Sequence, residues 1–353
     1  MKRGDEAVFE ITDVAYGGAG IARHEGRVVF VPFTIPGETV RARIGKVTRG
    51  WMQAEALEIL AASPDRVSPP CPVFGRCGGC AYQHIAYPRQ LEIKTRQVSE
   101  ALRRIGKFPA PPVEPARPSP LAYGYRNRIT VHVVPPHIGF RGLDPRKVID
   151  IRACLLAEES VNDALVRLRT KSRPRPGPAT LRADPEARGF RQVNAGAAAV
   201  LATVVAELAG PADLLVDAYC GAGFFAKQMR GQFARVLGID WDARSIEAAQ
   251  RDAGSNEEYR AGDAAELLPG ALNSPETTVV LLDPPAQGVA PAVIRTLLEI
   301  RPFRLVYVSC DPATLARDLH ALSGAYELQR AVPVDMFPQT ASIETACLLS
   351  AKQ

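Results

Sequence analysis

The chain changes its pattern of hydrophobic and polar positions twice along its 353 residues. From residue 6 to residue 60, short β-prone runs alternate with glycine and proline turn signals. Such spacing is typical of a small β-barrel, because each short strand is closed by a tight turn. The runs expected as strands are residues 7–11, 27–32, 39–46 and 53–59.

A second pattern covers the middle of the chain. Residues 87–107 place Leu91, Val98, Leu102 and Ile105 on one side of a helix, with charges elsewhere. Residues 108–120 hold six prolines, which predict an extended linker. Residues 123–134 alternate like a strand, and residues 139–151 like a second pair of strands. We therefore expect a short central α+β domain.

From residue 190 onward the pattern becomes β-α-β. Apolar runs at residues 214–217, 236–240, 279–282 and 305–308 are separated by helical stretches, which predicts an α/β, Rossmann-like parallel sheet. A chain longer than ~250–300 residues usually divides into domains. The expected division is a β-barrel at residues 1–62, a central part at 63–189 and a Rossmann-like part at 190–353.

The composition excludes some classes of protein but does not identify the function of the chain. The chain is 46% hydrophobic and 23% charged, as globular proteins are. Its net charge of +5 permits nucleic-acid binding without requiring it. The first residues lack an apolar segment behind their basic positions, and no run approaches the ~18 apolar residues that span a bilayer. We expect a cytoplasmic, monomeric protein with no membrane partner.

Three of the seven cysteines cluster, and the odd total does not fit a disulfide framework. Cys71, Cys77 and Cys80 lie within ten residues, separated by glycine and proline that permit a tight loop. Three such sulfurs can face one metal centre, and a fourth ligand must come from elsewhere. Their spacing leaves zinc and an iron–sulfur cluster both open. His84 is a candidate fourth ligand for zinc, although simple packing is the preferred interpretation.

A glycine-rich turn suggests a nucleotide-like cofactor. The strand at residues 214–217 enters a turn that contains Tyr219 and Gly221, and Asp240 ends the next strand about 20 residues later, where a ribose diol would be held. Asp263 closes the following strand near the expected adenine position. S-adenosylmethionine has no pyrophosphate, so it fits this sparse glycine pattern better than NAD does.

Cys310 stands where a buried strand gives way to a helix that Asp311 and Pro312 open. Backbone N–H groups at a helix start favour an anion, so we expect this position to help the thiol ionise. The alternative is a buried cysteine that behaves as a small apolar residue. Its position at the carboxyl end of a strand favours the functional interpretation, because open α/β sheets bind ligands there.

Three further motifs occur in a fixed order: L-L-D-P-P at residues 281–285, S-C-D-P-A-T-L-A-R-D-L at 309–319 and D-M-F-P-Q-T-A-S-I-E at 335–344. Together they resemble the RNA 5-methyluridine methyltransferases, and residues 21–40 are similar to the TRAM domain found ahead of many RNA-modifying enzymes. The resemblance implies that Cys310 is the nucleophile and Glu344 the general base. It implies a cofactor site for S-adenosylmethionine that comprises Gln192, Tyr219, Gly221, Asp240, Asp263 and Asp283. It also implies a 4Fe–4S cluster held by Cys71, Cys77, Cys80 and Cys154.

The chemistry explains this set of residues. Carbon 5 of uracil becomes nucleophilic only after a thiolate adds to carbon 6, and a base must later remove the carbon-5 proton. The uracil must also leave its stack. The expected partner is RNA, with ribosomal RNA favoured by the cluster segment and transfer RNA as an alternative. Ala286, Asp311 and Ser342 depart from the family pattern, so a non-catalytic iron–sulfur RNA-binding protein stays open.

Overall fold

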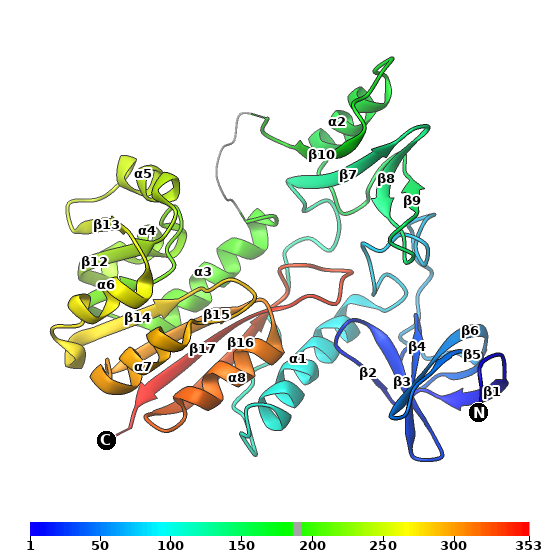
Figure 1. The fold of residues 1–353 in the computed structure, drawn as a ribbon, viewed down its shortest axis with the longest axis horizontal. Coiled ribbons are helices and arrows are strands. Elements are labelled where there is room, and N and C mark those ends of the chain that lie inside the picture. Colours follow the sequence, from blue (N-terminus) through cyan, green and yellow to red (C-terminus); the bar gives the residue numbers. More distant parts are fainter. Residues whose placement is uncertain (186–191, 353) are drawn as a thin grey trace. The chain divides into compact units, whose positions relative to one another are not determined.

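The computed structural model describes residues 1–185 and 192–352. By their contacts the residues form two compact units, which we describe separately (Figure 1). The first unit comprises Met1–Ile93, Leu121–Pro185 and Phe337–Ala341. The second comprises Lys94–Pro120, Glu186–Met336 and Ser342–Gln353. Within the described part of the chain, no helix is long and apolar enough to cross a membrane.

The first unit begins with a six-stranded sheet in the order β1-β5-β6-β4-β3-β2. Alternate side chains of its strands are buried, and they form a core that includes Val29, Val40 and Met52. All four predicted strands are present, whereas β2 and β3, which lie on either side of a glycine-rich turn, were not predicted. The strands are β1 (Glu6–Glu10), β2 (Asp13–Val14), β3 (Ala19–His24), β4 (Arg27–Pro32), β5 (Thr39–Val47) and β6 (Trp51–Ala61).

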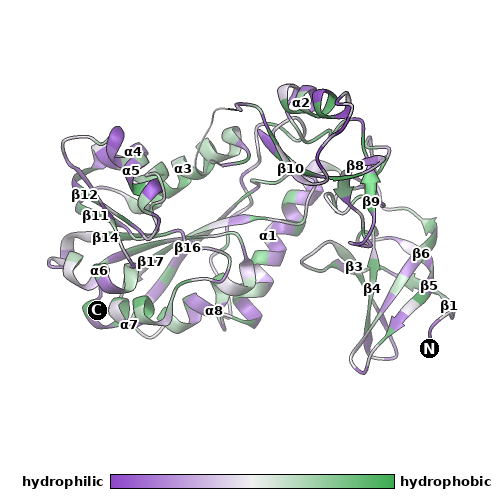
Figure 2. Ribbon diagram, turned by 45° about the horizontal axis from the view of Figure 1, so that its top comes forward, coloured by the Kyte–Doolittle hydropathy of each residue, from purple (hydrophilic) through white to green (hydrophobic). Residues whose placement is uncertain are grey.

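A four-stranded antiparallel sheet, in the order β10-β7-β8-β9, follows in the same unit. The helix α2 (Glu159–Arg169) buries Val161 and Leu165 in the small core of this sheet. Figure 2 shows hydrophilic and hydrophobic residues alternating around α2, as one-sided packing requires. The strands are β7 (Arg128–Val134), β8 (His137–Arg141), β9 (Val148–Asp150) and β10 (Gly177–Arg182).

The second unit contains a seven-stranded sheet in the order β13-β12-β11-β14-β15-β17-β16. The strands β11 to β15 run parallel to one another, whereas β17 is antiparallel to both β15 and β16. This confirms the predicted α/β fold. The strands are β11 (Ala212–Asp217), β12 (Phe233–Asp240), β13 (Glu257–Ala261), β14 (Thr278–Leu282), β15 (Arg304–Ser309), β16 (Tyr326–Val334) and β17 (Glu344–Ala351).

Helices pack against this sheet and supply much of the core. The predicted amphipathic helix is α1 (Tyr87–Arg104), which runs from the first unit into the second. The others in this unit are α3 (Ala195–Ala209), α4 (Phe224–Met229), α5 (Ala243–Arg251), α6 (Ala264–Ala271), α7 (Pro291–Ile300) and α8 (Pro312–Leu322), with short 3-10 turns at Arg230–Gln232 and Pro275–Thr277.

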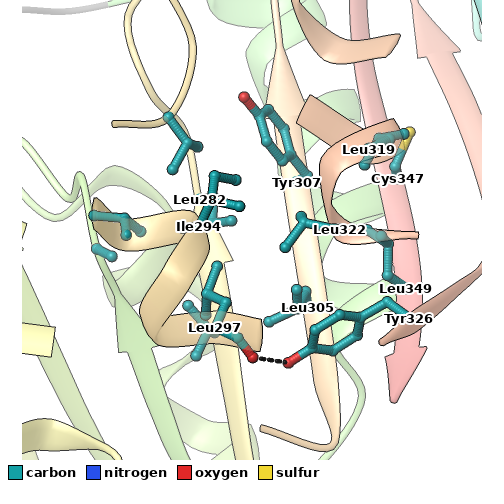
Figure 3. Packing of buried hydrophobic residues seen from close by; sticks show 14 of the residues in the cluster. Leu282, Ile294, Leu297, Leu305, Tyr307, Leu319, Leu322, Tyr326, Cys347 and Leu349 are labelled. Carbon is teal, nitrogen blue, oxygen red and sulfur yellow. Dashed lines mark hydrogen bonds between the residues drawn. The ribbon is translucent and has the colours of Figure 1, made fainter. Parts of the chain in front are cut away.

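The central strands of this sheet are hydrophobic on both faces. Every residue of β14 is buried, as expected for a parallel strand covered by helices on both sides. In the close view of Figure 3, leucines from α7 and α8 surround Leu305 and Tyr307 of β15. The hydroxyl of Tyr326 donates a hydrogen bond to the carbonyl of Leu297 at 3.2 Å, which ties β16 to α7. A rigid sheet therefore supports the loops at its carboxyl edge.

The proline-rich linker is extended, as predicted, and pairs along β16. Val113 and Arg117 form parallel bridges with Ala331 and Val334. Within the same unit, Nζ of Lys94 lies 2.6 Å from a carboxylate oxygen of Asp335, and both side chains are fully buried. This ion pair fixes the end of β16, just before the segment that leads to Glu344.

Candidate active site

The carboxyl edge of the parallel strands collects the polar residues of the second unit. Asp217 ends β11, Asp240 ends β12, Asp283 follows β14 and Cys310 follows β15. These four strands are neighbours in the sheet, so their ends lie along one edge. The sequence placed the last three of these residues in the site.

Gly221 and Asp240 meet as predicted. The N–H of Gly221 donates to one carboxylate oxygen of Asp240 at 2.8 Å, and the N–H of Asp242 donates to the other at 2.9 Å. Gly221 has a φ of 52°, a left-handed conformation that glycine adopts without strain. The first two strands of a nucleotide-type site are therefore joined through this carboxylate.

Tyr219 and Asp263 line one cavity of about 790 Å³, together with Pro285, Ile294 and other residues of the second unit. Asp263 also begins α6, because its side chain accepts a hydrogen bond from the N–H of Ala265 at 2.8 Å. The volume lies in the range of ~300–1,000 Å³ that holds small-molecule ligands. The structure thus brings these two predicted cofactor residues together.

Gln192 lies two residues before Asn194, the N-cap of α3, and is not among the residues that line this cavity. The side chain of Asn194 caps the helix by accepting a hydrogen bond from the N–H of Ala197 at 3.0 Å. The amide of Asn194 donates to the carbonyl of Met336 at 3.1 Å. The assignment of Gln192 to the cofactor stays a prediction.

Asp217 was missed as a site residue. It is fully buried, and within the described residues neither of its carboxylate oxygens has a well-formed hydrogen bond, although the N–H of Tyr219 lies close enough to favour the charged form. Burial, with Asp283 and Asp240 nearby, raises the pKa of Asp217 to about 8. Its position at the end of a strand was visible in the sequence, and that signal could have identified it.

The turn around Cys310 is fixed by its neighbours. Asp311 caps α8 by accepting a hydrogen bond from the N–H of Thr314 at 2.7 Å. The hydroxyl of Thr314 donates to the carbonyl of Ala286 at 3.1 Å, which holds the loop after Asp283 against the first turn of α8. Aspartate thus performs the capping that asparagine would perform, so this departure from the family pattern keeps its structural role.

The electrostatic environment of Cys310 corrects one expectation. Burial, followed by the carboxyl groups of Glu344 and Asp283, raises the pKa of the Cys310 thiol to about 11. The expected help from the helix start does not prevail, because burial and these two carboxyl groups outweigh it, and the Asp311 carboxylate at that start makes a smaller contribution of the same sign. In the free protein the thiol is therefore protonated at neutral pH, and it must lose its proton to a base.

Two carboxyl groups beside the thiol have unusual proton affinities. Glu344 is the first residue of β17 and lies opposite Val334 of β16. Burial, with Asp283 nearby, raises the pKa of Glu344 to about 8, and burial raises the pKa of Asp283 to about 7. Groups that titrate near neutrality suit general acid–base chemistry. Cys310, Glu344 and Asp283 thus form one coupled group, which the sequence had assigned from three separate motifs.

The four cysteines predicted as metal ligands lie in the first unit. Burial and the nearby Cys154 and Cys71 raise the pKa of Cys77, and burial with Cys154 and Cys77 raises that of Cys80. The amide of Asn162 holds the loop of Cys154 by accepting from its N–H at 2.8 Å. Among the described residues, no group of three or more His, Cys, Asp or Glu is arranged so as to hold a metal ion.

Arg126 places a positive charge near these thiols, whereas His84 packs against aromatic rings. Burial raises the pKa of Cys77, Cys80 and Cys154, whereas the charge of Arg126 opposes that rise, so a positive charge faces them. His84 is 1% exposed and packs against the rings of Phe33 and Phe74, which also contact each other. Burial and the charge of Arg66 lower the pKa of His84 to about 3, which fits the predicted packing role.

Comparison with known proteins agrees with this organisation. Family models match at residues 2–57 (TRAM domain), 216–281 (methyltransferase domain) and 266–352 (tRNA (uracil-5-)-methyltransferase). An uncharacterized RNA methyltransferase of Halalkalibacterium halodurans is 30% identical over 100% of this chain and 98% of its own length. One from Gloeobacter violaceus is 32% identical over 99% and 97%.

A solved structure shares the fold. The tRNA (uracil-54, C5)-methyltransferase of Pyrococcus abyssi, in complex with S-adenosyl-L-homocysteine, has a TM-score of 0.71 and 24% identity, covering 98% of this chain and 100% of that one. The motifs, the domain matches and the full-length relatives define a class, the TRAM-containing RNA-modifying methyltransferases. The chain belongs to the RNA (uracil-5-)-methyltransferase family.

Proposed function

We propose that this protein uses S-adenosylmethionine to methylate carbon 5 of a uracil in RNA through a covalent adduct with Cys310. The observation that carries the proposal is the coupling of the Cys310 thiol to Glu344 and Asp283. A structural cysteine in an apolar site would have no use for two carboxyl groups that titrate near neutrality.

Different residues of this chain carry out the proton transfers and the nucleophilic addition. Asp283 or Glu344 accepts the thiol proton, and the Cys310 thiolate adds to carbon 6 of the uracil, so that carbon 5 becomes nucleophilic. S-adenosylmethionine supplies the methyl group that carbon 5 takes. The Glu344 carboxylate then removes the carbon-5 proton, and the electron pair of that bond restores the 5,6 double bond as the sulfur leaves. Glu344 must be unprotonated at that point, so a neighbour or water carries away the first proton.

The cofactor fits the residues at the strand ends. The ribose diol is assigned to Asp240, and the adenine end to the cavity that Tyr219 and Asp263 line. Asp217 offers a buried carboxylate without a well-formed partner among the described residues, which suits the positive ammonium or sulfonium of S-adenosylmethionine. Gln192 and Gly221 complete the proposed set.

We also propose that Cys71, Cys77, Cys80 and Cys154 hold a 4Fe–4S cluster. Support comes from four thiols of one unit that influence one another electrostatically and from the Arg126 guanidinium that faces them. A cluster would supply structural support and a negative charge near the RNA. The reaction itself is redox-neutral, so no step passes through the cluster. The division into residues 1–62, 63–189 and 190–353 remains part of this proposal.

The substrate is proposed to be ribosomal RNA, because the family members that resemble this chain in their cysteine pattern act on it. Transfer RNA is the second candidate, since the related Pyrococcus abyssi enzyme is a tRNA methyltransferase. Mapping of 5-methyluridine in both RNA classes from a deletion strain separates the two. The class whose 5-methyluridine disappears is the substrate.

The function is tested by transfer of a labelled methyl group from S-adenosylmethionine to RNA from the deletion strain. Label on carbon 5 of uridine supports the proposal, provided that Cys310→Ala abolishes the transfer. Binding of RNA without any label transfer would instead favour the non-catalytic alternative, for which Ala286 and Ser342 are the departures to restore first.

A further inference from the structure

The positive charge of the chain is concentrated in its central part. Residues 121–185 contain 12 basic and 6 acidic side chains, a net charge of +6, while the whole chain carries +5. Residues 1–62 contain 8 of each and are electrically neutral. A partner with a phosphate backbone is attracted where the charge is unbalanced. The charge distribution therefore points to the central part more than to the β domain.

Some cations of the β domain already have local partners. Nη2 of Arg41 lies 2.9 Å from Glu58, and Nη2 of Arg43 lies 2.8 Å from Glu6. Lys46 lies 5.1 Å from the centre of the Trp51 ring. Because acidic and basic residues also balance over residues 1–62, this domain has no unbalanced charge to attract phosphates.

A basic pocket opens in the central part, within the first unit. It has a volume of about 430 Å³ and lies between the β7–β8 turn and the segment after α2. Buried Val133 and Ile138 form an apolar wall, and the exposed Pro135 and Pro136 stand beside it. The remaining lining residues are mostly polar or basic: Arg169, Lys171, Ser172, Arg173 and Pro174.

The three basic residues of this pocket play different parts. Arg169 is structural, since Nη1 donates to the carboxylate of Asp150 at 2.8 Å and to the carbonyls of Ile138 and Ile151. Lys171 and Arg173 are exposed, and within the described ranges their side chains form no hydrogen bond or ion pair. Two cations without local partners thus flank an apolar wall, an arrangement suited to a ligand with both phosphate and base.

We propose that the basic pocket is a nucleotide-binding site for single-stranded RNA, with Lys171 and Arg173 on a phosphate and the apolar wall, with its neighbouring prolines, against a base or ribose. The inference rests on the proposed function only in taking RNA as the partner. It deepens that function by naming the surface that supplies the RNA affinity.

The test is the salt dependence of binding of the full-length protein to a single-stranded uridine-containing RNA oligonucleotide, measured without S-adenosylmethionine. Each lost phosphate contact lowers the slope of log affinity against log salt by ~0.7. The double variant Lys171→Ala/Arg173→Ala should therefore lower the slope by ~1.4. The exchange Lys171→Arg/Arg173→Lys should keep the wild-type slope.

A matched control removes the same charge from the β domain. Arg41→Ala/Arg43→Ala should leave the slope within about 0.3 of wild type, because those cations have acidic partners. Equal melting temperatures of all variants show that the fold is intact. An unchanged slope in the pocket variant, or an equal drop in the control, overturns the proposal. If the wild-type protein transfers no methyl group but the pocket variant shows the lower slope of log affinity against log salt, the proposed function is wrong and the RNA-binding role of the pocket is still supported.

Discussion

Two groups of cysteines in this protein share burial that raises their pKa, but they differ in the charges that face them. Cys310 faces the carboxyl groups of Glu344 and Asp283, whereas Cys77, Cys80 and Cys154 face the guanidinium of Arg126, which partly opposes the effect of burial. A thiol beside carboxylates keeps its proton at neutral pH and loses it only when a base accepts that proton during the reaction. Thiols beside a cation, and beside one another, are suited to losing their protons to a metal. The two different functions that we propose for these cysteines rest on this difference in their neighbours.

The largest expected effect is at the nucleophile. Cys310→Ala should lower methyl transfer at least about a thousandfold, because no other group can form the carbon-6 adduct. Binding of S-adenosylmethionine should persist, as measured by calorimetry. Cys347→Ala is the control, since Cys347 is a fully buried core residue of the same unit. Substantial transfer by Cys310→Ala would remove the basis for the contrast between the two cysteine groups.

The second effect tests the other side of the contrast. Anaerobically purified wild type should contain about four irons per chain, and Cys154→Ser should contain less than about one. His84→Ala should retain its iron, because His84 is packed against aromatic rings. Iron, sulfide and zinc analysis measures this. A wild-type protein with one zinc and no iron would show that the cluster assignment is wrong.

A smaller effect concerns the proton affinity of Cys310. Removing a neighbouring negative charge lowers a thiol pKa, so Asp283→Asn should increase alkylation of Cys310 at neutral pH, roughly tenfold for each pKa unit lowered. Mass spectrometry after timed iodoacetamide treatment at several pH values measures it. Asp263→Asn is the control, because that carboxyl is not among the main influences on the pKa of the thiol. Slower alkylation in Asp283→Asn would contradict the assigned environment.

The smallest effect is on stability. A carboxyl group whose folded pKa lies above its unfolded value costs stability as pH rises from the unfolded to the folded pKa. For Glu344 this window runs from 4.5 to about 8. Glu344→Gln should therefore melt a few degrees above wild type at pH 8.5 and at the same temperature near pH 4. A difference that is equal at both pH values would point to packing instead of ionisation.

Much of this fold followed from sequence pattern. Residues 279–282 and 305–308 read as buried strands because nearly every position is apolar, and Asp311 with Pro312 marked a helix start. The edge that carries Cys310 was predictable for the same reason. The charge around Cys310 was not predictable, because Glu344 comes from a strand 34 positions later in the chain. No local sequence pattern relates two residues that far apart.

Other parts of the site required more than periodicity. Spacing alone grouped Cys71, Cys77 and Cys80, and only resemblance supplied Cys154, since a distant loop brings it near them. Asp217 had a visible position but no distinguishing motif. The pairing of charges in the β domain depends on cross-strand partners such as Arg43 and Glu6. The strand register determines these partners, and they cannot be derived from the composition.

The two catalytic roles are separated most directly in one experiment. In Glu344→Gln, addition of Cys310 and methyl transfer can proceed, yet the carbon-5 proton has no acceptor. The protein should therefore accumulate an RNA adduct that survives denaturing electrophoresis and carries the label of the cofactor methyl group. The double variant Cys310→Ala/Glu344→Gln should give no adduct. If Glu344→Gln turns over at close to the wild-type rate, or forms no adduct with Cys310 intact, Glu344 is not the base and the proposed mechanism is wrong.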